Sequence, residues 1–474
     1  MRQPFDPQWS LGQTPIDQIR LNGRSRFELI AILAGLQHLD ADVALRDQIL
    51  GMVASDVLGL RSDRRGRGGM SFWQILVLAV IRQGCNYDYA ALEHAANHDA
   101  LVRQFMQLGV LTNSRFAEKT IHENVSRLKP KTLERIVYLV AQQGHQLLPE
   151  AVEQVRGDSF VVQTNIHYPT DSNLLVDGIR KLTILSRRLA NEAGLRGWRQ
   201  SKHIHKKAKQ LDRKIGRWAR GRRKDREVQL QDAYSQLIDL ARKITDRSLE
   251  LYVATAGQTL DPLVAGQRKE ILDFTVKTDY VASLAQRRVL KGETIGHDEK
   301  IFSLFETHTE LINRGKRPCP IEFGHRVLVA EDNAGFIVHI EVMKTGLQDV
   351  DMLAPTIEAV QQRLDQKVKQ ASFDRGFWSP HNDRVLHESV ELACLPRKGA
   401  PKADEQTSPF IQARHHHAGI ESKIGALQSG NGQSRCRDQG DVGYARYIML
   451  GALARNLQTL GRLLLAGSSR ARAA

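Results

Sequence analysis

Apolar positions in the first third of the chain recur at the spacing of a helix. Phe27, Ile30, Leu33 and Leu36 lie three residues apart, and a run that is apolar except for Gln74 follows at residues 72–81. Side chains three or four residues apart share one face of a helix, so this spacing predicts an amphipathic helix. No alternating pattern typical of strands interrupts it. We therefore expect an all-helical N-terminal domain over residues 1–150.

The pattern changes to short runs rich in β-branched and aromatic residues after about residue 151. Such runs predict strands, and they lie at residues 160–166, 326–330, 336–342, 368–373 and 390–395. The intervening residues 331–335 carry Asn and Gly, which favour a hairpin turn. Helical patterns return at about 352–366 and 443–466. This alternation predicts an α/β fold with a mixed sheet flanked by helices, formed by residues 151–186 and 306–474.

Residues 187–305 show no strand pattern and begin with a basic segment. Sixteen Lys or Arg stand against three acidic residues over positions 187–226. We expect a basic helical insertion that interrupts the α/β domain. A charged run can be simple solvated surface, but like charges repel unless a partner neutralises them, and a DNA backbone would do so.

The whole chain carries a formal net charge of +15 over 474 residues. A surplus of this size favours a polyanionic partner, although ribosome association or solubility would also account for it. Two further segments are candidates for contact with nucleic acid. They are the basic, glycine-rich link at residues 63–69 and a helical pattern with polar and basic side chains at residues 118–128.

Cysteine usage and hydropathy indicate the compartment. The four cysteines lie far apart without paired spacing, which fits a reducing environment better than a disulfide framework. No signal-peptide pattern precedes the first helix, and no apolar run approaches the roughly 20 residues that span a bilayer. We expect a cytoplasmic protein with no membrane partner. A phosphate-binding GxxxxGK[ST] loop is also missing from the sequence, which argues against an ATP-driven motor.

Three acidic residues stand in contexts suited to metal-dependent phosphoryl transfer. This chemistry uses divalent cations about 4 Å apart, held by carboxylates on rigid elements. Asp158 interrupts an apolar strand pattern, where a carboxylate is costly to bury without a partner. Asp374 directly follows the predicted strand 368–373, and Glu421 lies in a helical pattern whose apolar side is formed by Ile420, Ile424 and Leu427.

The residues around these acids resemble those of the DDE transposases of bacterial insertion sequences, in particular the ISNCY group. The first acid precedes the run NIHYPTDS at residues 165–172, and the second begins DRGF at 374–377, followed by Ser379. The third follows a His-rich approach and precedes the stretch SRCRD at 434–438. A closing helix with ARNL at 454–457 is also typical, so the resemblance covers about residues 70–460.

This resemblance implies a ribonuclease-H-like catalytic fold in which Asp158, Asp374 and Glu421 hold Mg²⁺ or Mn²⁺. It implies a transposase whose helical N-terminal domain, residues 1–150, binds the terminal inverted repeats of its element. The protein would act as a homodimer on double-stranded DNA, cleave the element ends and join them to target DNA. Many relatives place an arginine four residues before the glutamate and a lysine seven after it, whereas this chain has His417 and Gln428. The residues expected to contact DNA are Arg375, His417, Lys423 and Arg435.

Other interpretations of the same residues remain open. A nuclease could use the three acids without joining DNA, and a transposase-derived regulator could bind DNA without any chemistry. The run His415, His416 and His417 could suggest zinc, but consecutive side chains point in different directions and rarely coordinate one ion.

Overall fold

The computed structural model divides the chain into two compact units. It describes residues 2–5, 12–59, 69–109, 112–258, 260–315, 320–397, 399–401 and 403–473. Unit 1 comprises Met1–Asn165 and Ile312–Ala474, and unit 2 comprises Ile166–Leu311. Of the glycine-rich link that the sequence singles out, residues 63–68 lie outside the described part of the chain.

The N-terminal segment of unit 1 is helical, as its periodicity predicts. Its helices are α1 (Glu28–Ala41), α2 (Val43–Leu58), α3 (Phe72–Gly84), α4 (Tyr89–His98), α5 (Ala100–Phe105), α6 (Glu118–Val125) and α7 (Pro130–Leu147). Ser71 and Gln74 form a reciprocal capping box that begins α3 at the start of its apolar run. These helices share one hydrophobic cluster with the sheet and with the C-terminal helix α16 (Gly440–Ala473), so they form no compact unit of their own.

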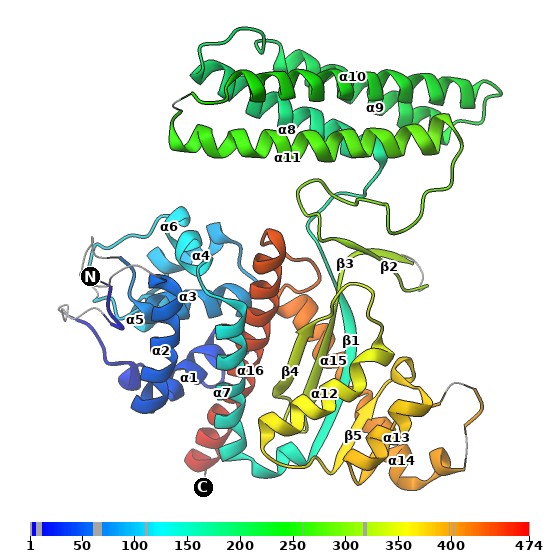
Figure 1. Cartoon of the computed structure of the whole chain (residues 1–474). Helices are drawn as coiled ribbons and strands as arrows, with labels where there is room; N and C mark the ends of the chain where they lie inside the picture. Colours follow the sequence, from blue (N-terminus) through cyan, green and yellow to red (C-terminus); the bar gives the residue numbers. More distant parts are fainter. Residues whose placement is uncertain are drawn as a thin grey trace. The chain divides into compact units, whose positions relative to one another are not determined.

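A mixed six-stranded sheet forms the centre of the rest of unit 1 (Figure 1). Its strands are β1 (Gln154–Gln163), β2 (Glu310–Asn313), β3 (Ile321–Asp332), β4 (Ile337–Val342), β5 (Gln370–Phe373) and β6 (Leu392–Cys394). The order is β2-β3-β1-β5-β6, and β4 also pairs with β3. β1 runs antiparallel to β3 and parallel to β5. The expected hairpin joins β3 to β4, with Gly335 at a φ of 82°.

Helices cover both faces of this sheet, as predicted. Val327 and Val329 of β3 belong to the cluster that contains α7 and α16, whereas the alternate residues Leu328 and Ala330 face the opposite cluster. That second cluster includes residues of α12 (Asp349–Leu364) and α13 (Pro380–Ser389). Successive side chains of a strand point to opposite faces of the sheet, so a strand that is covered on both faces contributes apolar side chains to both clusters.

Shorter helical elements complete the two units. They are α14 (Ser408–His417), α15 (Gly419–Gly425), the 3₁₀ turns η1 (Ile16–Gln18), η2 (Pro149–Glu153), η4 (Arg375–Phe377) and η5 (Asp404–Gln406), and the π turns η3 (Gln286–Leu290) and η6 (Ala426–Gly430).

Unit 2 is a bundle of four helices with a hydrophobic cluster of its own (Figure 1). The helices are α8 (Asp171–Glu192), α9 (Ser201–Arg220), α10 (Arg226–Ala254) and α11 (Pro262–Ala285). No described residue between 185 and 305 lies in a strand. Unit 2 begins at Ile166 rather than near residue 187, because α8 packs its apolar face against the other three helices. None of the described helices is long and apolar enough to cross a membrane.

Helices α1 and α16 approach one another closely at two glycines. A Cβ atom on Gly461 of α16 would lie 1.8 Å from the Ala31 carbonyl oxygen, and one on Gly35 of α1 would lie 2.7 Å from the Leu457 carbonyl oxygen. Backbone atoms cannot move aside as a flexible side chain can. The close packing of this helix pair therefore depends on the absence of side chains at these positions.

We predict that Gly461→Ala lowers the free energy of unfolding by about 1–3 kcal/mol, because the added methyl group forces α1 and α16 apart. Gly467→Ala on the same helix is the matched control, since nothing lies within 4 Å of a Cβ there. Urea unfolding of both variants measures the effect. Equal stability of the two variants would show that the helix pair tolerates the extra group.

Candidate active site

Strands β1 and β5 bring the first two predicted acids side by side. In their parallel pairing Gly157 lies opposite Phe373, so the next residues, Asp158 and Asp374, are neighbours at the end of β5. A Cβ on Gly157 would lie 2.6 Å from the Phe373 ring. The glycine before Asp158 thus makes room for the aromatic residue before Asp374.

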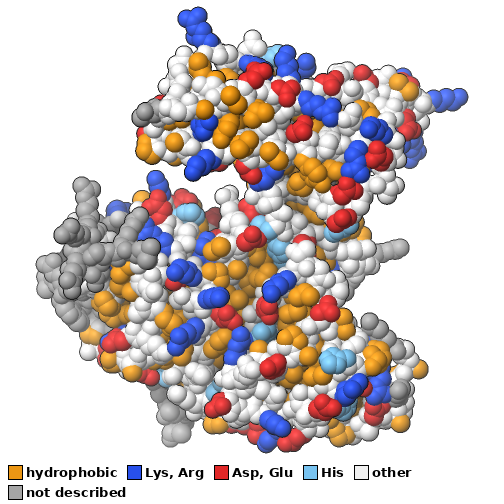
Figure 2. Space-filling model, viewed as in Figure 1, with side chains coloured by type: hydrophobic (Ala, Val, Ile, Leu, Met, Phe, Trp, Pro, Cys, Tyr) orange, Lys and Arg blue, Asp and Glu red, His pale blue; other side chains and the backbone are white. Residues whose placement is uncertain are grey.

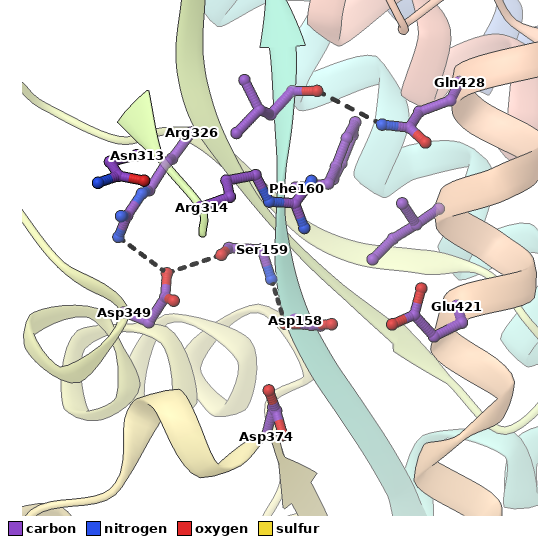
Figure 3. A pocket seen from close by; sticks show the side chains of 12 residues that line it. Asp158, Ser159, Phe160, Asn313, Arg314, Arg326, Asp349, Asp374, Glu421 and Gln428 are labelled. Carbon is purple, nitrogen blue, oxygen red and sulfur yellow. Dashed lines mark hydrogen bonds and ion pairs between the residues drawn. The ribbon is translucent and has the colours of Figure 1, made fainter. Parts of the chain in front are cut away.

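Glu421 reaches the same place from helix α15. Ile420 and Ile424 are buried, as is Leu427 in the following turn, which confirms the apolar side expected from the sequence. This orientation leaves Glu421 exposed on the opposite side. Figure 3 shows the three carboxylates directed toward one space. They line a pocket of about 460 Å³, together with Ser159, Phe160, Val161, Asn313, Arg314, Arg326, Asp349, Ile424 and Gln428.

The three acids have little charge compensation. Among the described residues, none forms an ion pair with Asp158, Asp374 or Glu421. The Ser159 backbone N–H donates to Asp158 over 2.7 Å, and the Arg375 N–H donates to Asp374 over 2.7 Å. Burial raises the pKa of Asp158 to about 7, and the negative charges of Asp374, Glu421 and Asp349 add to this rise. The pocket therefore concentrates negative charge that a cation would relieve.

Asp349 is a fourth acid in this pocket that the sequence did not single out. It lies in the first turn of α12, and its carboxylate accepts a hydrogen bond of 2.7 Å from the Ser159 hydroxyl. The Arg326 guanidinium lies 3.8 Å from the same carboxylate oxygen. An acid in the first turn of a helix is a common stabilising feature, so the sequence carries no signal that sets Asp349 apart.

Two arginines give the pocket a basic side. Arg326 donates to Gln348 over 2.8 Å, and Arg314 lies 3.5 Å from Glu322. Both side chains line the pocket while remaining partly exposed (Figure 3). A pocket with carboxylates and guanidinium groups suits a ligand that combines an anion with a metal cation, because each group then has an opposite charge nearby.

A buried ion network holds Glu421 in place relative to Asp158. Arg156, two residues before Asp158 on β1, lies 2.8 Å from buried Glu331 and donates over 2.6 Å to the carbonyl of His416 at the end of α14. Lys423, two residues after Glu421 on α15, lies 3.2 Å from the same Glu331 carboxylate. Because the network ties β1, β3, α14 and α15 together, it positions both acids.

The four predicted DNA-contact residues have different surroundings. Arg375 is exposed beside Asp374, and Arg435 is exposed with its guanidinium 3.0 Å from the Gln163 side-chain oxygen. Lys423 points inward: its side chain is only 12% exposed, and its ammonium group donates to the Gly335 carbonyl over 2.6 Å. Its charge balances buried Glu331, so in this conformation it has no free ammonium group for DNA.

His417 and Gln428 occupy the positions where the resemblance would place basic residues. Burial lowers the pKa of His417, while the charges of Asp374 and Glu421 partly oppose this shift, which places the ring near both acids. The Gln428 amide donates to the Val161 carbonyl over 3.4 Å and lines the pocket. Neither residue carries the full positive charge of the Arg or Lys in the related pattern at neutral pH.

The neighbouring histidines do not converge. His415 is exposed, and the His416 ring contacts the Asn333 side chain over 3.0 Å. In the described part of the chain, no three His, Cys, Asp or Glu side chains already stand in the arrangement of a metal centre. The carboxylates of the pocket share one space without meeting at one point, as expected of like charges.

The raised pKa of Asp158 makes its effect on stability depend on pH. The unfolded chain ionises this carboxyl near 3.8, whereas the folded protein retains the proton up to about pH 7. The buried charge therefore lowers the free energy of unfolding increasingly as pH rises from about 4 to 7. We predict that Asp158→Asn stabilises the metal-free protein by about 2–4 kcal/mol at pH 8 and by less at pH 5. Urea unfolding at both pH values measures this, and an equal change at both would contradict it.

Comparison of the chain with protein-family models, with curated proteins and with solved structures returns no match.

Proposed function

We propose that the chain is a DDE-type transposase that cleaves the ends of a DNA element and joins them to target DNA. One observation carries the proposal: Asp158, Asp374 and Glu421, which lie far apart in the sequence, line one pocket without a described ion-pair partner. The mixed sheet with helices on both faces is compatible with the ribonuclease-H-like fold that we propose for this part of the chain.

The donor groups of the pocket fit Mg²⁺ or Mn²⁺. Both ions prefer oxygen ligands, and four carboxylates, counting Asp349, line the space. Burial raises the pKa of Asp158, and repulsion by the neighbouring carboxylates adds to the rise; a divalent cation would relieve this repulsion. Asp158, Asp374 and Glu421 would hold the metal, and Asp349 would act through Ser159 and Arg326. When bound, the metal would activate the attacking oxygen and stabilise the leaving oxygen.

The remaining groups of the pocket would hold the scissile phosphate. Arg314 and Arg326 present guanidinium groups suited to phosphate oxygens on the side of the pocket away from Glu421 (Figure 3). The reaction first uses water to release a 3′-hydroxyl group at the element end. That hydroxyl group then attacks a target phosphodiester, so one phosphodiester bond forms as another breaks. No nucleotide cofactor is needed, because the number of phosphodiester bonds is conserved in the joining step.

The proposal implies double-stranded DNA as substrate and a homodimer on DNA, since two element ends must be joined together. The net charge of +15 supports a polyanionic partner. Exposed Arg375 and Arg435, together with His417, are the residues of the predicted DNA-contact set that remain near the pocket or its edge.

The test is an assay of cleavage and joining. Labelled DNA fragments from either side of the coding region are incubated with the full chain, a supercoiled target plasmid and Mg²⁺, with EDTA as the control. The proposal expects nicks at both element ends and joined products. Cleavage without joining would favour a nuclease, and binding without cleavage would favour a regulator; either result would overturn the proposal.

A further inference from the structure

Helix α9 of unit 2 carries an unusual surplus of positive charge. Over Ser201–Arg220 it has eight Lys or Arg residues and one acidic residue, Asp212. All eight basic side chains are exposed. By contrast α10, the next helix of the bundle, has four basic and five acidic residues. Half of the sixteen cations of the basic segment detected in the sequence therefore lie on this one helix.

Six of these cations form a stripe along α9, which we call the α9 stripe. Its members are Lys202, Lys206, Lys209, Arg213, Arg217 and Arg220. They follow one another at intervals of three or four residues, so they share one face of the helix. The buried residues Ala208, Leu211 and Ile215 lie on the opposite face, against the core of the bundle. Over 18 residues the stripe extends roughly 27 Å.

The α9 stripe forms no ion pair with the described acidic residues, although the charge of Lys209 acts on Asp177 of α8. No ion pair involves any of its six side chains, although several other cations of unit 2 are paired. Lys181 lies 2.6 Å from Glu270, Lys277 lies 2.7 Å from Asp273, and Arg288 lies 2.7 Å from Asp171. Figure 2 shows basic and acidic side chains interspersed on the visible face of this bundle. The unpaired stripe thus differs from the mixed charge elsewhere on unit 2.

Aligned cations at this spacing repel one another, and an extended polyanion would remove that repulsion. Duplex DNA carries one negative charge per roughly 1.7 Å of its axis, so several phosphates lie within reach of a rigid stripe of this length. Trp218, the only Phe, Tyr or Trp of α9, lies on the side of the helix away from the stripe. Unpaired bases would find none of these rings to stack on beside the stripe, which favours a duplex over a single strand. We infer that the α9 stripe binds the phosphate backbone of duplex DNA, independently of base sequence.

This inference rests on the proposed function only in taking DNA as the partner, and it adds a binding surface outside the catalytic pocket. The test uses the full chain with four stripe residues changed together: Lys206→Gln, Arg213→Gln, Arg217→Gln and Arg220→Gln. The matched control removes the same charge from exposed positions elsewhere on unit 2: Lys243→Gln, Lys269→Gln, Lys291→Gln and Lys300→Gln.

Fluorescence anisotropy with a labelled 40-base-pair duplex of random sequence measures binding in EDTA over a series of salt concentrations. We expect the stripe variant to bind about 10- to 100-fold more weakly than the control at 100 mM salt. The magnitude of its slope of log affinity against log salt should fall by up to about 3.6, since each of the four lost phosphate contacts removes about 0.9. Circular dichroism confirms that both variants keep their helices.

Three results would overturn the inference. They are equal DNA binding by the two variants, no duplex binding by the unmodified chain, and a selective loss of RNA binding with DNA binding kept. Because the assay contains no divalent metal, its outcome does not depend on catalysis. The chain could fail to cleave and join DNA and still bind duplex DNA through the α9 stripe. That result would count against the proposed function and not against the inference about the stripe.

Discussion

Asp158→Asn is expected to abolish both cleavage and joining while DNA binding is retained. Asparagine keeps the shape of the side chain but removes one of the three carboxylate charges that would hold a divalent cation, together with Asp374 and Glu421. We predict a loss of about 10³-fold or more in both reactions, which corresponds to roughly 4 kcal/mol of transition-state stabilisation. Single-turnover cleavage of an element end in Mg²⁺ measures the first reaction, and recovery of joined plasmid measures the second.

The matched control for this variant is Glu388→Gln, which removes a carboxylate from an exposed position on α13 in the same unit. It should retain full activity. Loss of activity through unfolding is excluded by the stability measurement, since Asp158→Asn is expected to be more stable than the unmodified chain at pH 8. Activity of Asp158→Asn close to that of the control would refute the assignment of this pocket as the catalytic centre.

Asp438→Ala is expected to cause the largest loss of stability among single changes considered for unit 1. The Asp438 side chain is 4% exposed and lies 2.7 Å from Arg82 of α3 and 3.1 Å from Arg446 of α16. Arg82 is also buried, with its guanidinium over the Tyr89 ring. Removal of the carboxylate leaves two buried guanidinium groups without their anion, so we predict a loss of about 3–5 kcal/mol in the free energy of unfolding.

Asp47→Ala provides the comparison, because Asp47 pairs with Arg46 at the surface and its side chain is 61% exposed. An exposed ion pair contributes about 1 kcal/mol or less. Urea unfolding at pH 7 measures both variants. If Asp438→Ala cost no more than Asp47→Ala, the buried cluster would have another source of charge compensation, and the assigned role of Asp438 would be wrong.

The position of Asp438 connects this cluster to the candidate site. Three residues earlier, Arg435 forms an isolated parallel bridge with Gln163 at the end of β1, the strand that carries Asp158. The C-terminal part of the segment between α15 and α16 is thereby attached to both β1 and the helices α3 and α16. In the sequence the stretch 434–438 resembled the basic stretch that follows the third acid of the family, while in the structure its aspartate contributes to the packing of α3 against α16.

Local patterns in the sequence were sufficient to predict the secondary structure that carries the candidate site. The strand pattern predicted at residues 160–166 overlaps β1, which begins earlier, at Gln154, and so includes Asp158; the pattern before Asp374 corresponds to β5. The apolar spacing of Ile420, Ile424 and Leu427 correctly predicted the buried side of the Glu421 helix. These features depend on residues within a few positions of one another, where side-chain direction follows from the period of the helix or strand.

The grouping of the site residues was decided by tertiary structure. The parallel register of β1 and β5 places Asp158 beside Asp374 across more than 200 positions of sequence, and α12 adds Asp349 to the same pocket. No local pattern distinguishes Asp349 from an ordinary first-turn acid, or Lys423 from an exposed lysine. Only the folded chain shows that Lys423 balances Glu331.

The division into units was likewise a property of the fold. Helical periodicity identified residues 1–150 as helical, but it could not show that these helices pack with α16 around one core. It also placed the start of the insertion near residue 187, whereas α8 from Asp171 onward belongs to unit 2. The amphipathic pattern of a helix specifies that one face is buried, and the partner that covers this face is selected by packing between segments distant in sequence.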